Sequence, residues 1–91
     1  MEFWSKRVTS WISHLICSTE DLKARTDLLK FFISCGKYSL TLQNFNTLNE
    51  IVDALSMSPI QRLVKTWKNL PNKYKSYWLV ILNFFFLLFT F

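Results

Sequence analysis

Apolar residues recur along the first half of the chain at the spacing of amphipathic helices. Between residues 3 and 16 they follow steps that keep them on one side of a helix, and this stripe consists of Trp4, Val8, Trp11, Ile12, Leu15 and Ile16. A second helix is predicted from about residue 20 to about residue 42, starting at a capping arrangement of Ser18 with Asp21. Apolar residues cover more than one side of it, so we expect several neighbouring helices. Gly36 in its middle indicates a close helix crossing.

The second half continues the helical pattern in shorter segments. Asn44 or Asn46 can cap a helix over about residues 47 to 55, whose apolar face consists of Leu48, Ile51, Val52 and Leu55. Ser58, followed by a proline, predicts the start of another helix, which Pro71 ends. The apolar stripe of that helix is Ile60, Leu63, Val64, Trp67 and Leu70. Because the connections are short, successive helices should pack as hairpins, and we predict an all-α fold.

The C-terminal residues depart from this amphipathic pattern. Residues 77–91 contain Asn83 and Thr90 as their clearly polar members, and no charged residue follows Lys75. A membrane-spanning helix needs about 20 apolar residues, so this run is short for a bilayer. We expect an atypical hydrophobic tail, with membrane association through the tail as one alternative.

Composition and charge add two constraints. Of 91 residues, 51% are hydrophobic and 18% aromatic, which is high for a small soluble domain. The net charge is +5, and because residues 1–59 are balanced, the whole excess lies in Arg62, Lys65, Lys68, Lys73 and Lys75. Such a cluster can attract an anionic partner or be a solvated helix face. We expect no nucleic-acid partner, because Trp67 belongs to the buried stripe and would not be free to stack on bases.

Residue patterns of catalysis are absent from the sequence. With one glycine the chain has no phosphate-binding loop motif, and His14 has no partner in a catalytic or zinc-like spacing. Cys17 and Cys35 lack metal or redox spacing, so we interpret them as buried thiols in a reducing compartment. We therefore expect no metal, no cofactor and no bond-making chemistry.

Three motifs follow one another in a fixed order. The first is a helix with Trp11 followed by L-x-x-R at residues 22–25, the second is L-x-N-F-N at residues 42–46, and the third is S-P-I-x-R-L-x-x-T-W at residues 58–67. Over residues 8–75 their order and spacing resemble the central part of the catalytic domain of Ras-type guanine-nucleotide exchange factors, the RasGEF domain.

The resemblance implies that the chain is part of a larger all-helical bowl that grips a Ras-family small GTPase. In the family, a helical hairpin opens the first switch of the GTPase. Preference for the nucleotide-free GTPase then lowers nucleotide affinity by reciprocity. An amide in the second motif contacts the second switch, which here implies GTPase binding by Gln43, Asn44 and Asn46.

A scaffold role is the alternative for several motif residues. Asn44 and Asn46 would then be helix caps and Phe45 a core residue. We expect Arg62 and Thr66 to serve as polar ties, and the tryptophan that follows to lie in the core.

The hydrophobic end departs from the family pattern. We divide the chain into a partial RasGEF catalytic domain at residues 1–76 and a non-family tail at residues 77–91. The sequence contains no counterpart of the earlier family helices or of the opening hairpin. We therefore expect a truncated, cytoplasmic exchange factor with little activity of its own. A non-catalytic helical binding module and a short tail-anchored membrane protein are the alternatives.

Overall fold

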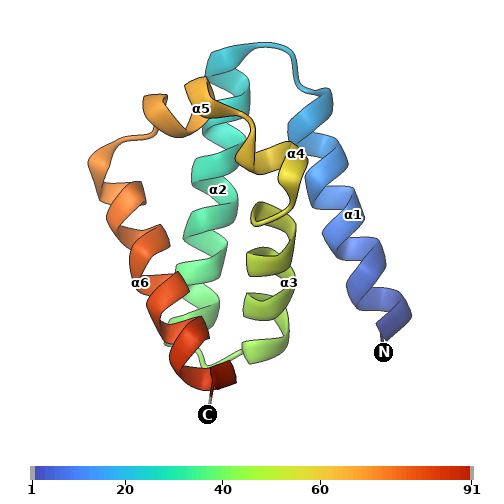
Figure 1. The fold of residues 1–91 in the computed structure, drawn as a ribbon, viewed down its shortest axis with the longest axis vertical. Coiled ribbons are helices and arrows are strands. Elements are labelled where there is room, and N and C mark those ends of the chain that lie inside the picture. The colour runs from blue at the N-terminus through green and yellow to red at the C-terminus, as the bar shows by residue number, and fades with distance from the viewer. Residues whose placement is uncertain (1, 91) are drawn as a thin grey trace.

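The computed structural model describes the backbone of residues 2–90 and the side chains of residues 7–87. This part of the chain is helical and contains no strand, which confirms the predicted all-α class. The helices, in chain order, are α1 (Glu2–Ser18), α2 (Leu22–Thr41), α3 (Phe45–Leu55), α4 (Ser58–Gln61), α5 (Val64–Asn69) and α6 (Asn72–Thr90). Figure 1 shows α4 and α5 at one end of the molecule and the α2–α3 connection at the other.

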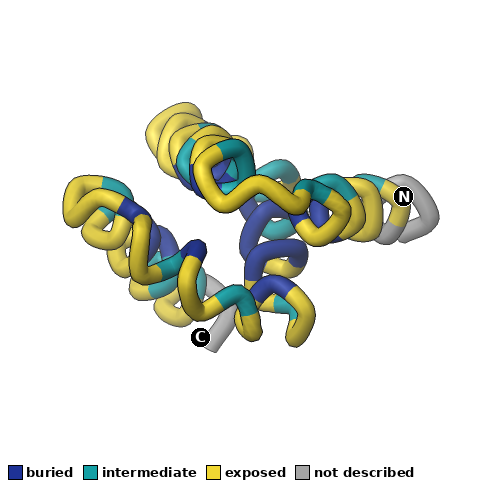
Figure 2. Tube along the Cα trace, turned by 90° about the horizontal axis from the view of Figure 1, so that it is seen from above, coloured by how far each residue is buried: buried dark blue, intermediate teal, exposed yellow. Residues whose placement is uncertain are grey.

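The core lies where α3 meets α1, α2 and α6. All four apolar residues predicted for the inner face of α3 are buried, and Figure 2 shows buried positions along the inward sides of the helices. Fully burying an aliphatic side chain of this size stabilises a fold by about 1.5–3 kcal/mol. The neighbouring helices contribute Ile12, Ile16, Leu29, Ile33, Trp78 and Ile81 to the same core.

Gly36 marks the close crossing that the sequence predicts. A Cβ atom at this position would lie 3.1 Å from Cδ1 of Ile81 and 3.4 Å from Cγ2 of Ile51. Because α3 and α6 both pack against α2 here, a side chain would separate them. The predicted close crossing is confirmed.

The first helix packs through a narrower stripe than predicted. Ile12 and Ile16 are buried, whereas Trp11 is 59% exposed and makes an edge-to-face contact with Phe32 at 6.2 Å between ring centroids. The neighbours of α1 are α2, α3 and α4, and they cover its isoleucine side more fully than the Trp11 side. The side chain of Trp4 lies outside the described residues. Cys17, predicted to be buried, is exposed because it lies on the outer side of α1.

The cap of α2 is Asp21 alone. Its Oδ2 accepts a hydrogen bond from the Ala24 backbone N–H at 3.0 Å. Ser18 was predicted to take part, but it is the last residue of α1, and its hydroxyl donates to the carbonyl of Leu15 at 3.3 Å. Ser18 therefore satisfies a carbonyl at the end of one helix rather than an N–H group at the start of the next.

The helix predicted from Ser58 onward is divided in two. Met57 precedes α4 as its N-cap and Ser58 is already helical, so the predicted cap at Ser58 is wrong. The helix ends at Gln61, and Leu63, with ψ 63°, precedes α5. As a result Val64, predicted to be buried, is 62% exposed.

Two side chains bond to backbone carbonyls around α4. The indole N–H of Trp67 donates to the carbonyl of Ile60 at 2.9 Å and so crosses the break between α4 and α5. Nε2 of Gln61 donates to the carbonyl of Leu55 at 2.7 Å and so satisfies an acceptor at the end of α3. The predicted end of this region before Pro71 is confirmed, because α5 stops at Asn69.

The hydrophobic end of the chain forms α6, which begins at Asn72 and continues without interruption across residue 76. Trp78 and Ile81 are buried, and Trp78 packs on Trp67 with 5.7 Å between ring centroids. Along the described chain no helix has both the length and the hydropathy that crossing a bilayer requires. The side chains of residues 77–87 that face α2 and α3 thus contribute to the core, while the boundary at residue 76 stays a prediction.

Candidate functional site

The three amides predicted to bind a GTPase lie together where α2 ends and α3 begins. Gln43, Asn44 and Asn46 are all exposed there, and we call this group the amide corner. It occupies the end of the molecule opposite α4 and α5 (Figure 1). In the described chain, the side-chain amides of Gln43 and Asn46 form no hydrogen bond with other residues, so their donors and acceptors are available to a partner.

Gln43 holds an unusual backbone conformation, with φ 58°. The Asn44 N–H bonds to the carbonyl of Ser39 at 2.8 Å and the Gln43 N–H to that of Leu40 at 3.1 Å. These two bonds form a Schellman motif, whose left-handed position usually holds glycine. An L-residue other than glycine costs about 1–2 kcal/mol there. A strained residue that directs an amide to solvent motivates a functional hypothesis for this turn.

Asn44 has a structural role that the sequence predicted. Its Oδ1 accepts a hydrogen bond from the Thr47 N–H at 3.3 Å and so caps α3. Asn46 is already in the first turn of α3 and does not cap it, so the capping alternative is wrong for Asn46. The side-chain oxygen of Asn44 is therefore engaged locally, and the amides of Gln43 and Asn46 are the less constrained members of the corner.

Phe45 connects the amide corner to α6. Its half-buried ring stacks on Phe84 with 5.8 Å between centroids and 18° between planes. The predicted packing role of Phe45 is confirmed, since it belongs to the hydrophobics that pack against the core. Part of the hydrophobic end of the chain thus supports the turn that carries the amides.

A groove beside the amide corner has a volume of about 430 Å³. It is lined by Phe31, Ser34, Cys35, Tyr38, Ser39 and Thr47, and we call it the α2–α3 groove. Ser39 and Thr47 are also the backbone partners of Asn44, so the groove adjoins the corner. Phe31 and Tyr38 are exposed at its edge. Burial raises the pKa of the Cys35 thiol, which keeps this lining neutral.

The sequence pattern does not indicate the groove residues as a site. It predicts several helices around α2, whose apolar residues cover more than one side, and a buried thiol at Cys35. In the structure α3 and α6 occupy the Gly36 side of α2, and Phe31 remains exposed. The width of the apolar arc was the available signal, because a helix with apolar residues on several sides needs more neighbours than this chain provides.

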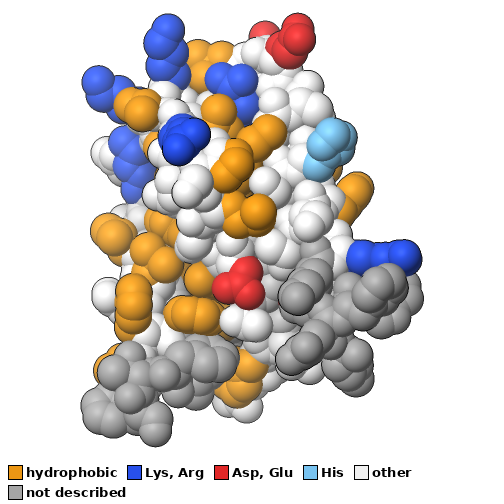
Figure 3. Space-filling model, turned by 45° about the vertical axis from the view of Figure 1, so that its right-hand side comes forward, with side chains coloured by type: hydrophobic (Ala, Val, Ile, Leu, Met, Phe, Trp, Pro, Cys, Tyr) orange, Lys and Arg blue, Asp and Glu red, His pale blue; other side chains and the backbone are white. Residues whose placement is uncertain are grey.

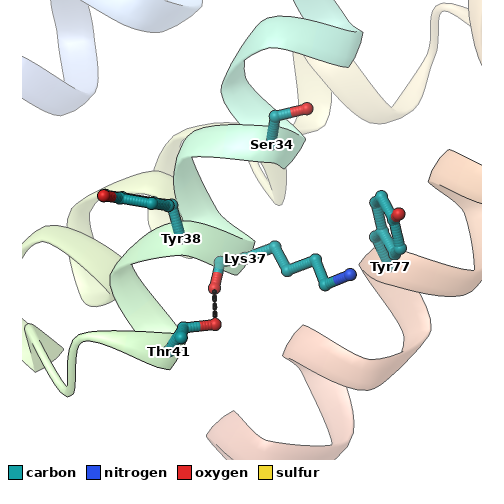
Figure 4. A pocket seen from close by; sticks show the side chains of 5 residues that line it. All are labelled: Ser34, Lys37, Tyr38, Thr41 and Tyr77. Carbon is teal, nitrogen blue, oxygen red and sulfur yellow. Dashed lines mark hydrogen bonds between the residues drawn. The ribbon is translucent and has the colours of Figure 1, made fainter.

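On the side of α2 that faces α6, Lys37 contacts Tyr77 and so joins the two helices near the amide corner. Figure 4 shows the Lys37 side chain reaching from α2 to the ring of Tyr77, while Tyr38 points away from α6. The Lys37 Nζ lies 3.6 Å from the ring centroid, a cation–π contact worth about 0.5–1 kcal/mol at an exposed site. A small pocket lined in part by Lys37 and Tyr77 has a volume of about 240 Å³.

The first and third sequence motifs meet at the opposite end of the molecule. Nε of Arg25 donates to Oγ1 of Thr66 at 2.7 Å, and Nη1 donates to the carbonyl of Thr19 at 3.2 Å. Thr66 is fully buried, which confirms its predicted role as a polar tie. Arg62 was expected to act in the same way, but its side chain is exposed and forms no hydrogen bond in the described structure. The polar tie to Thr66 is instead made by Arg25.

Metal-binding residues do not gather in the part of the chain that the structure describes, where no three His, Cys, Asp or Glu side chains lie close enough to hold an ion. The amide corner and groove instead offer neutral hydrogen-bonding groups beside an apolar surface. This combination suits recognition of another protein, in which polar contacts orient a partner and apolar contacts bury its surface.

The RasGEF domain family model matches residues 1–85. Ras guanine nucleotide exchange factor M of Dictyostelium discoideum is 36% identical over 80 residues, which are 88% of this chain and 9% of that protein. Cell division control protein 25 of Saccharomyces cerevisiae is 40% identical over 60 residues, or 66% of this chain and 4% of that protein. Ras guanine nucleotide exchange factor efc25 of Schizosaccharomyces pombe is 43% identical over 65 residues, which are 71% of this chain and 7% of that protein.

No solved structure matches the chain. The chain spans less than a tenth of the length of each of these three relatives. The family match covers all three sequence motifs and includes the first part of α6. On these grounds the chain belongs to the RasGEF domain family.

Proposed function

We propose that this chain takes part in guanine-nucleotide exchange on a Ras-family small GTPase and that the amide corner docks the second switch of that GTPase. Membership of the RasGEF family and the names of the relatives support the class of activity. The observation that carries the site is Gln43, which keeps a strained backbone and an unpaired amide at the surface. The chain would act by binding, without bond-making chemistry.

Exchange by such a surface requires differential binding. Each hydrogen bond from a corner amide to the GTPase would contribute about 0.5–1.5 kcal/mol net, and the exposed Phe31 and Tyr38 would add apolar contact. If the docked switch conformation is the one that GTPases adopt without nucleotide, the same binding energy lowers nucleotide affinity. We also propose a cytoplasmic location, which the free thiols of a reducing compartment would suit.

We further propose that the isolated chain stimulates exchange weakly. It corresponds to 4–9% of the length of the three relatives described above, and docking one switch does not open the other. Release of a fluorescent nucleotide from a panel of Ras, Rap and Ral GTPases measures this directly. We expect a small acceleration with at least one member. Rates equal to those of a complete exchange-factor domain would refute the proposal of weak activity.

A substitution at Gln43 separates the site from the fold. Gln43→Gly removes the amide and relieves the left-handed strain, so stability should rise by about 1 kcal/mol. Binding to nucleotide-free GTPase should weaken by about fivefold, the equivalent of one hydrogen bond of about 1 kcal/mol. Asn72→Ala is the matched control, because it removes an exposed amide at the start of α6, away from the corner. Undiminished binding by Gln43→Gly would show that the corner is not the docking site.

The α2–α3 groove also supports a second candidate, a helical binding module that holds a GTPase or another helical protein without promoting release. A pull-down that compares nucleotide-free with nucleotide-loaded GTPase distinguishes the two. Preference for the nucleotide-free form favours exchange. Equal capture of both forms, reduced by Gln43→Gly, favours the binding module.

A further inference from the structure

The cationic excess of the chain gathers at the end opposite the amide corner. Figure 3 shows Lys and Arg side chains at the end that carries α4 and α5, with hydrophobic side chains between them. A pocket of about 330 Å³ lies there, between the first turn of α2 and the α4–α5 connection. Arg25, Arg62, Leu63, Val64 and Lys65 line it, and we call it the basic pocket.

Arg25 is oriented before any ligand arrives. It is half-buried, and its hydrogen bonds to Thr66 and to the carbonyl of Thr19 fix the plane of the guanidinium group. A guanidinium held in one orientation loses little conformational freedom when it binds a phosphate group, and its planar donors match phosphate oxygens. Arg62 and Lys65 add two exposed cations to the same pocket.

Among the described side chains, no carboxylate forms an ion pair with a cation of the basic pocket. Lys30 pairs with Asp27, and both lie outside it. Glu20 and Asp21 are exposed at the nearby α1–α2 connection, yet neither pairs with a cation of the pocket. Three positive charges without an ion-pair partner in one site favour a polyanionic ligand over a neutral one.

We propose that the basic pocket binds the phosphorylated headgroup of an anionic membrane lipid, a phosphoinositide. A volume of about 330 Å³ exceeds the size of one phosphate and admits a sugar phosphate. Val64 is 62% exposed at the pocket, and Lys68 is exposed on the same helix. An apolar side chain among basic ones is suited to the interface of an anionic bilayer.

Nucleic acid also carries phosphates, but this surface offers no group that would stack on bases. Trp67, the nearby aromatic residue of α5, is half-buried, packs on Trp78 and donates its N–H to the carbonyl of Ile60.

The proposal does not depend on GTPase binding, because the two sites lie at opposite ends of the molecule (Figure 1). A membrane bound at the basic pocket would leave the amide corner facing away from the lipid.

Flotation of the full chain with vesicles tests the pocket. Vesicles of phosphatidylcholine alone are compared with vesicles that also contain a bisphosphorylated phosphoinositide and with vesicles matched in charge by phosphatidylserine. We expect the phosphoinositide vesicles to bind most tightly, and the soluble inositol phosphate of the same headgroup to compete. Equal binding to both charged vesicles would overturn headgroup recognition. Binding of the soluble headgroup without vesicle binding would overturn the lipid as the ligand.

Paired variants locate the contact. Arg62→Ala with Lys65→Ala should weaken phosphoinositide binding by about thirtyfold, since each basic residue near an anionic surface contributes about fivefold. Lys73→Ala with Lys75→Ala removes the same charge outside the pocket and should weaken binding only a few-fold. All four residues are exposed, so unchanged urea midpoints are expected.

Equal losses in the two pairs, or equal affinity for a nucleic-acid duplex and for phosphoinositide vesicles, would overturn the proposal. Gln43→Gly should bind vesicles like the unmodified chain, so failure of the GTPase proposal would leave this test intact.

Discussion

Replacing Ile81 with alanine tests whether the hydrophobic end of the chain belongs to the fold. Ile81 is 0% exposed, and its Cδ1 lies against the backbone of α2 at Gly36. Ile→Ala changes in a core cost about 2–5 kcal/mol, and the cost is greatest where neighbours cannot move into the cavity. Gly36 has no side chain that could do so, and Ile51 is itself buried. We therefore expect a loss of about 3–4 kcal/mol, against a total stability of roughly 5–14 kcal/mol for a chain of this size.

Urea unfolding followed by tryptophan fluorescence measures this loss, because Trp78 is buried next to Trp67 and should change its emission on unfolding. Leu79→Ala is the matched control. Leu79 is 61% exposed on the same helix, so its truncation should change stability by about 0.5 kcal/mol or less. If the two variants unfold at the same urea concentration, α6 does not pack on α2. The stacking of Phe84 on Phe45 would then be refuted as well.

Three further predictions concern other parts of the molecule. Gly36→Val should lower stability by about 1–3 kcal/mol, because a branched side chain overpacks the crossing; an unchanged thermal midpoint would contradict the close approach of α6. Thr66→Val keeps the shape but removes the acceptor of the Arg25 Nε–H, at a cost of about 1–3 kcal/mol in urea unfolding, and Thr66→Ser should retain most of the stability. Burial raises the pKa of Cys35, so its thiolate fraction at mildly alkaline pH is reduced. It should react more slowly than the exposed Cys17 with a thiol reagent; mass spectrometry of labelled peptides shows the order, and equal rates in the folded protein would refute it.

Periodicity predicted the parts of the fold that depend on local spacing. The four apolar residues of α3 recur at the helical period, and all four are buried. Gly36 in the middle of an apolar helix has few explanations other than a close neighbour, and two neighbours are present. In both cases the sequence contains the physical cause itself, either a stripe of side chains or a missing Cβ.

The errors occur where a neighbour that is distant in sequence decides the outcome. Trp11 and Val64 fit their stripes by spacing, yet both are exposed because the packed helices do not extend over them. The bond from Trp67 across the α4–α5 break and the bond from Gln61 to the end of α3 reach carbonyls seven and six residues away in the chain. Helical periodicity cannot show such bonds, since they depend on the path of the chain after each helix ends.

The amide corner shows how far a sequence motif leads and what geometry adds. The motif placed Gln43 among candidate contacts, but no local pattern predicts a left-handed glutamine, because that position ordinarily takes glycine or asparagine. Glycine would be more stable than glutamine at this position, so stability alone does not explain the residue. Its strain therefore argues for a role in binding rather than in folding. Most substitutions near a site lower stability and binding together, which leaves their cause ambiguous. Gln43→Gly is expected to change the two in opposite directions, so a rise in stability with a fall in GTPase binding would assign the amide to recognition.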